Sequence, residues 1–336
     1  MAILKVDTIS GIGTEGPVFE GDIEFTSQNF LTLPKGDTAQ RGRGRGVIFG
    51  GFVNPAIVSQ ISYLELQSMG NSVEFGSLTT ATRDGGSAGN STRGLHGAGQ
   101  QPSFVNTIEL VTIATTSNAT NFGDLNQTTF QGAAVGNETR YVYGGGTTPT
   151  VQDVIDFVTF STTGDATDFG NLTVARFALT AFGSPTRGIY AGGATPTIVN
   201  TIDYITIASA GDATDFGDVT SDDTRNPMAV SSATRGVIAG GQTPAPDVGT
   251  NAIDLLTIAT TGNTTDFGDL TDGRRRGTGL SNSIRGVFAG GYDPSAKNVM
   301  DYITIATTGN AQDFGDTEAT VFRLGTGASD SHGGLS

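Results

Sequence analysis

The chain has 336 residues, no cysteine and a formal net charge of −15, from 33 acidic and 18 basic side chains. So acidic a surface disfavours nucleic acid and anionic membranes as partners, and without cysteine there are no disulfides or thiolate metal sites. No apolar run reaches membrane-spanning length and the first 30 residues lack a basic region followed by an apolar core, so we expect neither membrane insertion nor a signal peptide.

The first predicted element is a β-prone N-terminal arm, residues 1–44. Its apolar residues alternate in places, as Ile23 and Phe25 do. Two or three such strands are marginally stable in water by themselves, so we expect the arm to gain order on the rest of the chain, on sister chains or on a larger assembly. Its candidate docking residues are Leu4, Val6, Ile9, Phe19, Ile23, Phe25, Leu31 and Leu33.

A repeat occupies the chain from Arg45 to the C-terminus. An Arg followed by a short apolar run and glycines recurs at intervals of 47 to 50 residues, at Arg45, Arg93, Arg140, Arg187, Arg235 and Arg285. Each copy is followed by a second apolar run and then by a Phe-Gly pair, at Phe75, Phe122, Phe169, Phe216, Phe267 and Phe314. Such a period indicates stacked or radial repeats.

Each repeat is predicted to form four short strands. In one copy these are strand a (176–184), strand b (187–193), strand c (200–209) and strand d (212–220), because β-branched and aromatic runs there are bounded by turn-forming residues. Strand c is apolar on both faces, with Ile202 and Tyr204 on one and Ile205 and Ile207 on the other. The adjacent blades of a propeller would cover both faces.

The chain ends favour a closed ring over a solenoid, which needs distinct polar caps. The first repeat starts directly at strand b, and the last residues, from Arg323, match the strand a that begins at Arg275. We therefore predict an all-β protein: a six-bladed β-propeller (45–336) whose first blade is completed by residues 323–331 pairing with the strand at Arg45, preceded by the β-prone arm. Such pairing covers the edge of the strand at Arg45.

Two resemblances suggest an origin. LTLPKGDTAQR (31–41) resembles the LPxGTTAQRP segment of tail fibres and other virion proteins of tailed bacteriophages, with Asp37 and Gly42 departing from it, and the opening KVDTISG is similar to N-terminal strands that dock such fibres on the virion. The repeats resemble kelch-type propellers through their paired glycines, although the chain has no Trp. Acidic, Thr-rich and Lys-poor repeats look most like those of marine phages.

These resemblances imply a non-enzymatic virion structural protein, a tail fibre or capsid decoration protein. The arm would dock on other virion proteins, of capsid or tail, and the propeller would be displayed for adhesion to a host surface glycan or protein, or for decoration. A homo-oligomer fits this interpretation, and no cofactor is implied. The alternatives are a cellular glycan-binding propeller and a glycan-active enzyme that uses acidic residues in the central channel, which would need a carboxylate pair at catalytic spacing.

Candidate catalytic and metal residues are few. The repeated Asp-Phe-Gly lacks the other kinase motifs, so we expect Phe to pack between blades, Gly to bend the chain and Asp to cap the c–d turn; calcium binding by these carboxylates is the alternative. The histidines are His96, expected to pack as an aromatic substitute in strand b, and His332, expected to be exposed.

The arginines that open strand b could form a ring on one face. We expect each to pair with an Asp of a nearby c–d segment, the alternative being a ring that binds anions. The opposite face carries the b–c and d–a loops, which depart most from the repeat, as a binding face on a rigid scaffold would. Its candidate binding residues are Gln242, Asp247, Asp272, Arg274, Arg275, Arg276, Tyr292 and Lys297.

Overall fold

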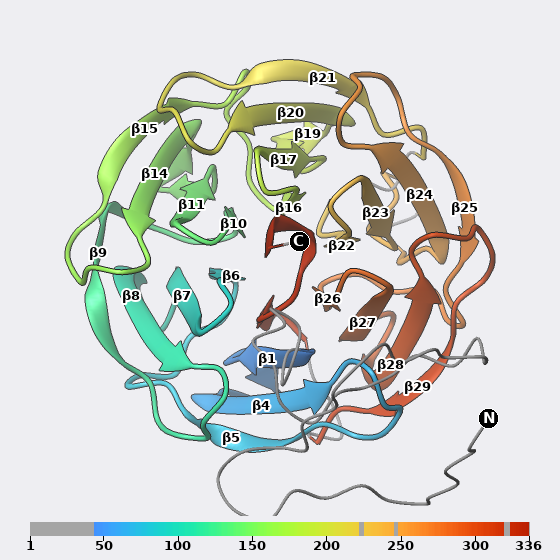
Figure 1. The fold of residues 1–336 in the computed structure, drawn as a ribbon, viewed down its shortest axis with the longest axis horizontal. Coiled ribbons are helices and arrows are strands. Elements are labelled where there is room, and N and C mark those ends of the chain that lie inside the picture. The colour runs from blue at the N-terminus through green and yellow to red at the C-terminus, as the bar shows by residue number, and fades with distance from the viewer. Residues whose placement is uncertain (1–43, 222–224, 245–247, 319–322, 336) are drawn as a thin grey trace, which may run out of the picture. The chain divides into compact units, whose positions relative to one another are not determined.

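The computed structural model describes residues 44–335 apart from 222–224, 245–247 and 319–322. All the candidate docking residues of the arm, and Asp247, lie outside the described residues. The described chain forms six four-stranded antiparallel sheets arranged as blades around a central channel (Figure 1). The predicted six-bladed β-propeller is therefore confirmed. None of the helical structure in the described ranges is long and apolar enough to span a membrane.

Each blade runs outward from the channel in the order a, b, c, d, with strand a innermost (Figure 1). Blade 1 contains β30 (Thr326–Ser329), β1 (Arg45–Phe49), β4 (Gln60–Glu65) and β5 (Val73–Ser77); blade 2 contains β6 (Gly86–Gly89), β7 (Arg93–Gln100), β8 (Phe104–Thr112) and β9 (Thr120–Thr129); blade 3 contains β10 (Ala133–Gly136), β11 (Arg140–Gly144), β14 (Val154–Thr159) and β15 (Thr167–Asn171). Blade 4 contains β16 (Thr180–Gly183), β17 (Arg187–Ala191), β20 (Thr201–Thr206) and β21 (Thr214–Asp218); blade 5 contains β22 (Met228–Ser231), β23 (Arg235–Ala239), β24 (Ala252–Thr257) and β25 (Thr265–Asp269); blade 6 contains β26 (Thr278–Ser281), β27 (Arg285–Tyr292), β28 (Ala296–Thr304) and β29 (Gln312–Asp316).

Short hairpins extend the b–c connections of three blades. They are β2 (Phe52–Val53) with β3 (Ala56–Ile57), β12 (Thr147–Thr148) with β13 (Thr150–Val151), and β18 (Ala194–Thr195) with β19 (Thr197–Ile198). A single 3₁₀ turn, η1 (Gly333–Leu335), ends the described chain. In blades 2 and 6 the b and c strands themselves are longer, so the b–c connection differs in form from blade to blade.

The C-terminus closes the ring as predicted. Strand β30 pairs antiparallel with β1, with Gly46 opposite Ser329 and Phe49 opposite Thr326. A further bridge joins Phe52 to Arg323. Because the two partners lie at opposite ends of the described chain, the first blade cannot be completed until synthesis has reached β30.

The core is divided among the six interfaces between neighbouring blades. Phe216 is 2% exposed and lies in one apolar cluster with Ile202 of its own blade and with Ile238 and Leu256 of blade 5. Ile205 lies in the cluster on the opposite side, against blade 3. Both faces of strand c are therefore covered by adjacent blades, as the sequence predicted.

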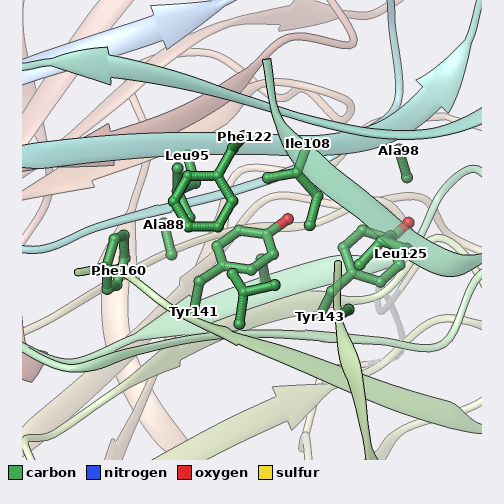
Figure 2. Packing of buried hydrophobic residues seen from close by; sticks show 12 residues of the cluster. Ala88, Leu95, Ala98, Ile108, Phe122, Leu125, Tyr141, Tyr143 and Phe160 are labelled. Carbon is green, nitrogen blue, oxygen red and sulfur yellow. The ribbon is translucent and has the colours of Figure 1, made fainter. Parts of the chain in front are cut away.

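The interface between blades 2 and 3 shows this packing at close range. Figure 2 shows Tyr141 of blade 3 beside Phe122 and Ile108 of blade 2. The Tyr141 hydroxyl donates a hydrogen bond of 2.8 Å to the Gly86 carbonyl of blade 2. Polar tips of core aromatics thus tie one blade to the next.

The glycine of each Phe-Gly pair makes room for the next blade. A Cβ atom on Gly217 would lie 2.6 Å from the carbonyl carbon and oxygen of Gly262, in the c–d turn of blade 5, and its φ is +143°. In the same place the Gly262 amide donates to the Phe216 carbonyl at 2.8 Å. The equivalent bond from Gly70 to Phe314 joins blade 1 to blade 6.

The predicted capping role of the Asp-Phe-Gly aspartates is wrong. Asp168 and its equivalents are exposed residues of strand d. The capping oxygen comes instead from the residue three positions earlier, and it acts between blades: Asp212 Oδ1 accepts from the Asn171 amide at 3.0 Å, and Asn263 Oδ1 accepts from the Asp218 amide at 3.0 Å. Either Asp or Asn serves, because only a side-chain oxygen acceptor is required.

Candidate functional site

The propeller has two unlike faces. The a–b and c–d turns share one, here called the turn face. The b–c and d–a connections share the other, here called the loop face, where the bridges Arg225–Gln242 and Arg275–Tyr292 join a d–a connection to a b–c connection. This confirms that the irregular loops meet on one face.

The strand-b arginines lie on the turn face, and their guanidinium groups contact backbone carbonyls instead of the c–d aspartates, so the predicted pairing of each Arg with such an Asp is wrong. Each donates from its guanidinium to a carbonyl at the end of strand c of the next blade: Arg187 to Ile258 at 3.0 Å, and Arg285 to Leu66 at 3.0 Å, which closes the circle. The remaining donor–carbonyl pairs are Arg45–Ile113, Arg93–Phe160, Arg140–Ile207 and Arg235–Ile305. Arg45 also forms an ion pair, with Glu65 of its own blade.

Stacking holds several of these guanidinium groups in place. Arg187 lies 4.6 Å from the ring centroid of Tyr204, and Arg140 lies 4.5 Å from that of Phe157. A stacked guanidinium keeps its in-plane N–H groups free to donate. The turn-face arginines therefore serve as clamps between blades.

The last described residues of the chain lie at the turn-face end of the channel; in Figure 1 they are at the centre of the ring. His332 is partly buried there, so its predicted exposure is wrong: its Nε2 lies 2.6 Å from the Gly89 carbonyl, and the Gly334 amide donates to Nδ1 at 3.1 Å. These contacts fix the neutral tautomer that carries its proton on Nε2. Burial lowers the pKa of His332, an effect that the Gly89 carbonyl opposes.

At the loop-face end of the channel the chain forms a ring of six residues, here called the mouth ring. In each blade the residue two positions before strand a has a positive φ, between 56° and 64°. Its amide donates to the carbonyl of the equivalent residue in a neighbouring blade, and the six bonds, 2.7 to 3.0 Å long, close a circle. The mouth ring consists of Asp84, Gln131, Ala178, Asn226, Arg276 and Leu324.

The mouth ring is closed by backbone hydrogen bonds. Its six members share a conformation that costs a non-glycine residue on the order of 1–3 kcal/mol, yet they are acidic, amide, aliphatic and basic in turn. No side-chain chemistry is common to them, so the shared backbone conformation does not require a particular side chain at these positions.

Arginines gather around the mouth. Besides Arg276, the residue just before the mouth ring is Arg in four of the six blades and Phe in the other two. Arg323 stacks between Phe52 and Tyr292, at 4.9 and 4.6 Å from their ring centroids. The other stacked pairs are Arg83–Phe52, Arg225–Phe177 and Arg275–Tyr292. In the described residues, the mouth thus collects five of the chain's arginines.

Among the described residues, one carboxyl, that of Asp84, faces this positive charge. The Asp84 side chain is 7% exposed and its Oδ2 lies 3.9 Å from Arg83 Nε. Burial raises the pKa of Asp84 to about 6, and Arg276 and Arg83 hold it back from rising further. Burial likewise lowers the pKa of Arg276, Asp84 opposes that effect, and the charges of Arg275, Arg225 and Arg323 reinforce it.

A cavity of about 120 Å³ opens below the mouth ring, lined by the first residues of every strand a. Its walls are mainly Gly, Ala, Ser and Thr, and its charged lining residues are Asp84 and Arg276. Asn226 also lines it, is 9% exposed, and has a side-chain amide nitrogen with no hydrogen-bond partner. An unsatisfied buried amide costs about 1–3 kcal/mol, so this donor is suited to a ligand.

The three consecutive arginines that were predicted to bind together, Arg274 to Arg276, have different surroundings in the structure. Arg274 is fully buried and pairs with Asp301 at 2.8 Å, while its Nη2 donates to the Phe288 carbonyl. It belongs to the scaffold and is not available on a binding face; Arg176 and Asp203 make the same pair in blade 4. Arg275 and Arg276 lie at the mouth, as described above.

The other predicted binding residues lie on the loop face. Tyr292 takes part in the arginine stacks. Gln242 is buried, and its backbone N–H donates a hydrogen bond to the Arg225 carbonyl. Lys297 and Asp272 form an exposed ion pair of 2.6 Å. Sequence reasoning missed Asp84 and Asn226, and it missed Arg83, Arg225 and Arg323.

A buried acidic residue in strand c was also missed. Asp203 accepts hydrogen bonds from both the amide and the hydroxyl of Thr173 in the preceding d–a connection, at 3.1 and 2.6 Å. Asp156, Asp254, Asp301 and Glu109 make related contacts in their blades. The recurrence of an acid within an apolar run was the signal for this structural role.

His96 lies in the core of the propeller. His96 is 2% exposed, stacks on Phe49 at 5.7 Å between centroids, and lies 3.0 Å from the hydroxyls of Thr82 and Ser87. This confirms its predicted packing role. Burial lowers the pKa of His96 to about 4. Within the described ranges no three His, Asp or Glu side chains converge as metal ligands.

No protein-family model matches the chain, and comparison with curated proteins finds no significant match. The fold and the contacts at the mouth therefore carry the functional argument.

Proposed function

We propose that the protein is a non-enzymatic virion structural protein of a tailed phage, in which the arm docks on the particle and the propeller is displayed for adhesion or decoration. One observation supports the adhesive part: the unlike chemistry of the two faces. The turn face uses its arginines as clamps between blades, whereas the loop face varies from blade to blade and gathers arginines around an open cavity.

The virion part of the proposal rests on the arm. Its resemblance to the segments that attach fibres to phage particles covers residues outside the described structure, and its β-prone sequence is too short to bury a core of its own. The kelch-like character of the repeats agrees with a displayed module. Capsid and tail are both open as docking sites.

The channel lining favours binding over glycoside cleavage. Hydrolysis of glycosides uses two carboxyl groups about 5–10 Å apart. Among the described residues that line the two halves of the channel, the acidic side chain is Asp84. The described lining therefore offers no carboxyl pair at catalytic spacing, which supports a binding role.

Immunogold labelling of purified particles with antibodies against the full chain tests the proposal. We expect gold at fixed positions on head or tail, together with the chain in the protein content of washed particles. Free full-length chain in excess should also slow adsorption of the particles to their host if the propeller acts as an adhesin. Absence of the chain from washed particles would overturn the virion assignment.

A further inference from the structure

The mouth of the channel is a candidate ligand site of definite chemistry. It combines the half-buried guanidinium of Arg276 with the neighbouring side-chain amide of Asn226, whose nitrogen has no partner. The carboxyl of Asp84 and the amide of Gln131 lie on the other side of the ring. All four have their backbone fixed by the mouth-ring hydrogen bonds. Rigid placement of a few polar groups in a cavity is typical of a small-molecule site.

We propose that the mouth binds the carboxylate of an acidic saccharide. Arg276 and the Asn226 amide would hold the carboxylate, because a guanidinium presents parallel N–H donors that match its two oxygens and the amide adds a further donor. Asp84 and Gln131 would accept hydrogen bonds from the sugar hydroxyls. This assignment rests on the loop face being the binding face proposed above.

The charge pattern selects among anions. The like charges of Arg225, Arg275 and Arg323 surround Arg276, so a bound anion relieves repulsion that the protein otherwise carries. Asp84 lies within the same mouth and would repel a second negative charge. A singly charged group with neighbouring hydroxyls therefore fits better than a dianionic phosphate, and a uronic acid has that composition.

The cavity size sets how much of the ligand enters. A cavity needs about 10–15 Å³ to hold one water molecule. The cavity of about 120 Å³ can therefore hold the carboxylate and part of one sugar ring, but not several sugar residues. The small side chains below the ring leave this space open. We expect the terminal or a side-facing uronate of a polysaccharide to bind, with the rest of the chain outside.

Orphan guanidinium nitrogens by themselves do not mark the site. Arg176 and Arg274 also have an Nε without a partner, although their other nitrogens are engaged in buried ion pairs. The distinguishing observation is the Asn226 amide, which is buried, lines the cavity and has no partner. Ala178 occupies the equivalent place in blade 4, so the scaffold does not require this amide.

The repeat itself supplies the test variants. Arg276→Gln and Asn226→Ala introduce residue types that blades 3 and 4 carry at the same position of the mouth ring, in Gln131 and Ala178. Both should fold with a melting temperature near that of the unmodified chain. Lys297→Gln is the matched control: it removes one positive charge from the same face, from an exposed ion pair away from the cavity lining.

Calorimetric titration of the full chain with trigalacturonate provides the measurement, with the fully methyl-esterified trisaccharide as a neutral probe of the same shape. We expect binding of the acid and none of the ester. Arg276→Gln should weaken binding by about 10- to 100-fold, Asn226→Ala by a smaller factor, and Lys297→Gln by less than about two-fold. Inorganic sulfate and phosphate, titrated separately, should bind more weakly than the saccharide.

Four results would overturn the assignment. The first three are no binding of trigalacturonate, equal binding of acid and ester, and equal losses in Arg276→Gln and Lys297→Gln. The third would mean general attraction to a positive face. The fourth is tighter binding of inorganic sulfate than of the saccharide, which would show a free-anion site instead. If the saccharide fails while particles still carry the chain and free chain still blocks adsorption, the proposed function stands with another ligand; if the saccharide binds but particles lack the chain, only the virion assignment fails.

Discussion

Arginine has three roles in this protein, and the neighbours of each side chain decide which one it takes. Arg187 clamps two blades through a carbonyl, Arg274 is buried against Asp301, and Arg276 faces the cavity at the channel mouth. Arg274 and Arg276 are only two positions apart. A run of basic residues is therefore not one functional unit here, and each member needs its own test.

Replacing Arg274 should destabilise the fold. Arg274→Ala leaves the buried Asp301 carboxylate without its cation, and removing one partner of a buried pair typically costs about 3–5 kcal/mol. Lys297→Ala breaks an exposed pair and should cost about 0–1 kcal/mol. Urea unfolding of both variants measures the two losses. Equal small losses would mean that the Arg274–Asp301 pair contributes nothing to stability.

Asp84 should make stability depend on pH. Its pKa rises from 3.8 to about 6 on folding, mainly through burial, so between these values the folded state holds a proton that the unfolded state releases. This contribution is complete below about pH 4 and is lost as the pH rises through 6. The groups that face Asp84 are Arg276, Arg83, Arg323 and Gln131, and arginine and glutamine side chains do not titrate in this window.

Asp84→Asn replaces the titrating carboxyl with an amide, and Asn is the residue that blade 5 carries at the same position, in Asn226. We expect the variant to exceed the unmodified chain in stability at pH 7.5 by on the order of 2–3 kcal/mol and to match it near pH 4. Melting temperatures of both proteins at the two pH values check this. A difference of the same size at both values would show that Asp84 is not the responsible group.

The strands and turns of each blade were largely predictable, because the buried residues recur at the same positions in every repeat. The Phe of each Phe-Gly pair and the apolar runs of strand c recur at a fixed period, and the match between residues 323–336 and a strand a indicated closure. The clamps on the turn face were not predictable, since their acceptors are backbone carbonyls, which have no sequence signature. The mouth ring was not predictable for a related reason: its six positions share a backbone conformation but no residue type.

Close approach between blades should be visible in a pair of glycine substitutions. Gly217→Ala places a Cβ 2.6 Å from the backbone of Gly262, whereas Gly211→Ala meets nothing within 4 Å, and the two residues have similar φ values of +143° and +156°. Backbone strain is thus shared, and the difference isolates the clash. We expect Gly217→Ala to be less stable by about 1–3 kcal/mol in urea unfolding. Equal stabilities would contradict the interlocked turns.

Ring closure by β30 should be required for the fold. A chain ending at Glu318 lacks the strand and exposes the edge of β1, which invites pairing between molecules. We expect aggregation or loss of cooperative unfolding. A chain ending at Ser331 is the control, because it keeps β30 and loses only His332 and the residues after it, η1 included. Monomeric behaviour and equal melting temperatures for both truncations, by light scattering and calorimetry, would show that closure is dispensable.

At the scale of the whole molecule, charge is distributed unevenly. The chain carries a net charge of −15, yet the mouth gathers five arginines among the described residues. An anionic ligand is repelled by most of the surface and attracted at one opening, which favours selective over general binding. A propeller is suited to this arrangement, since its closed scaffold fixes a varied face around one axis.

Electron cryo-tomography of phage particles attached to host cells tests the central claim most directly. If the propeller is a displayed binding module, averaged density should show six-bladed rings held on the particle with the loop face directed toward the cell and the channel mouth open. Rings whose loop face is covered by a neighbouring virion protein, or attached particles without rings, would contradict it.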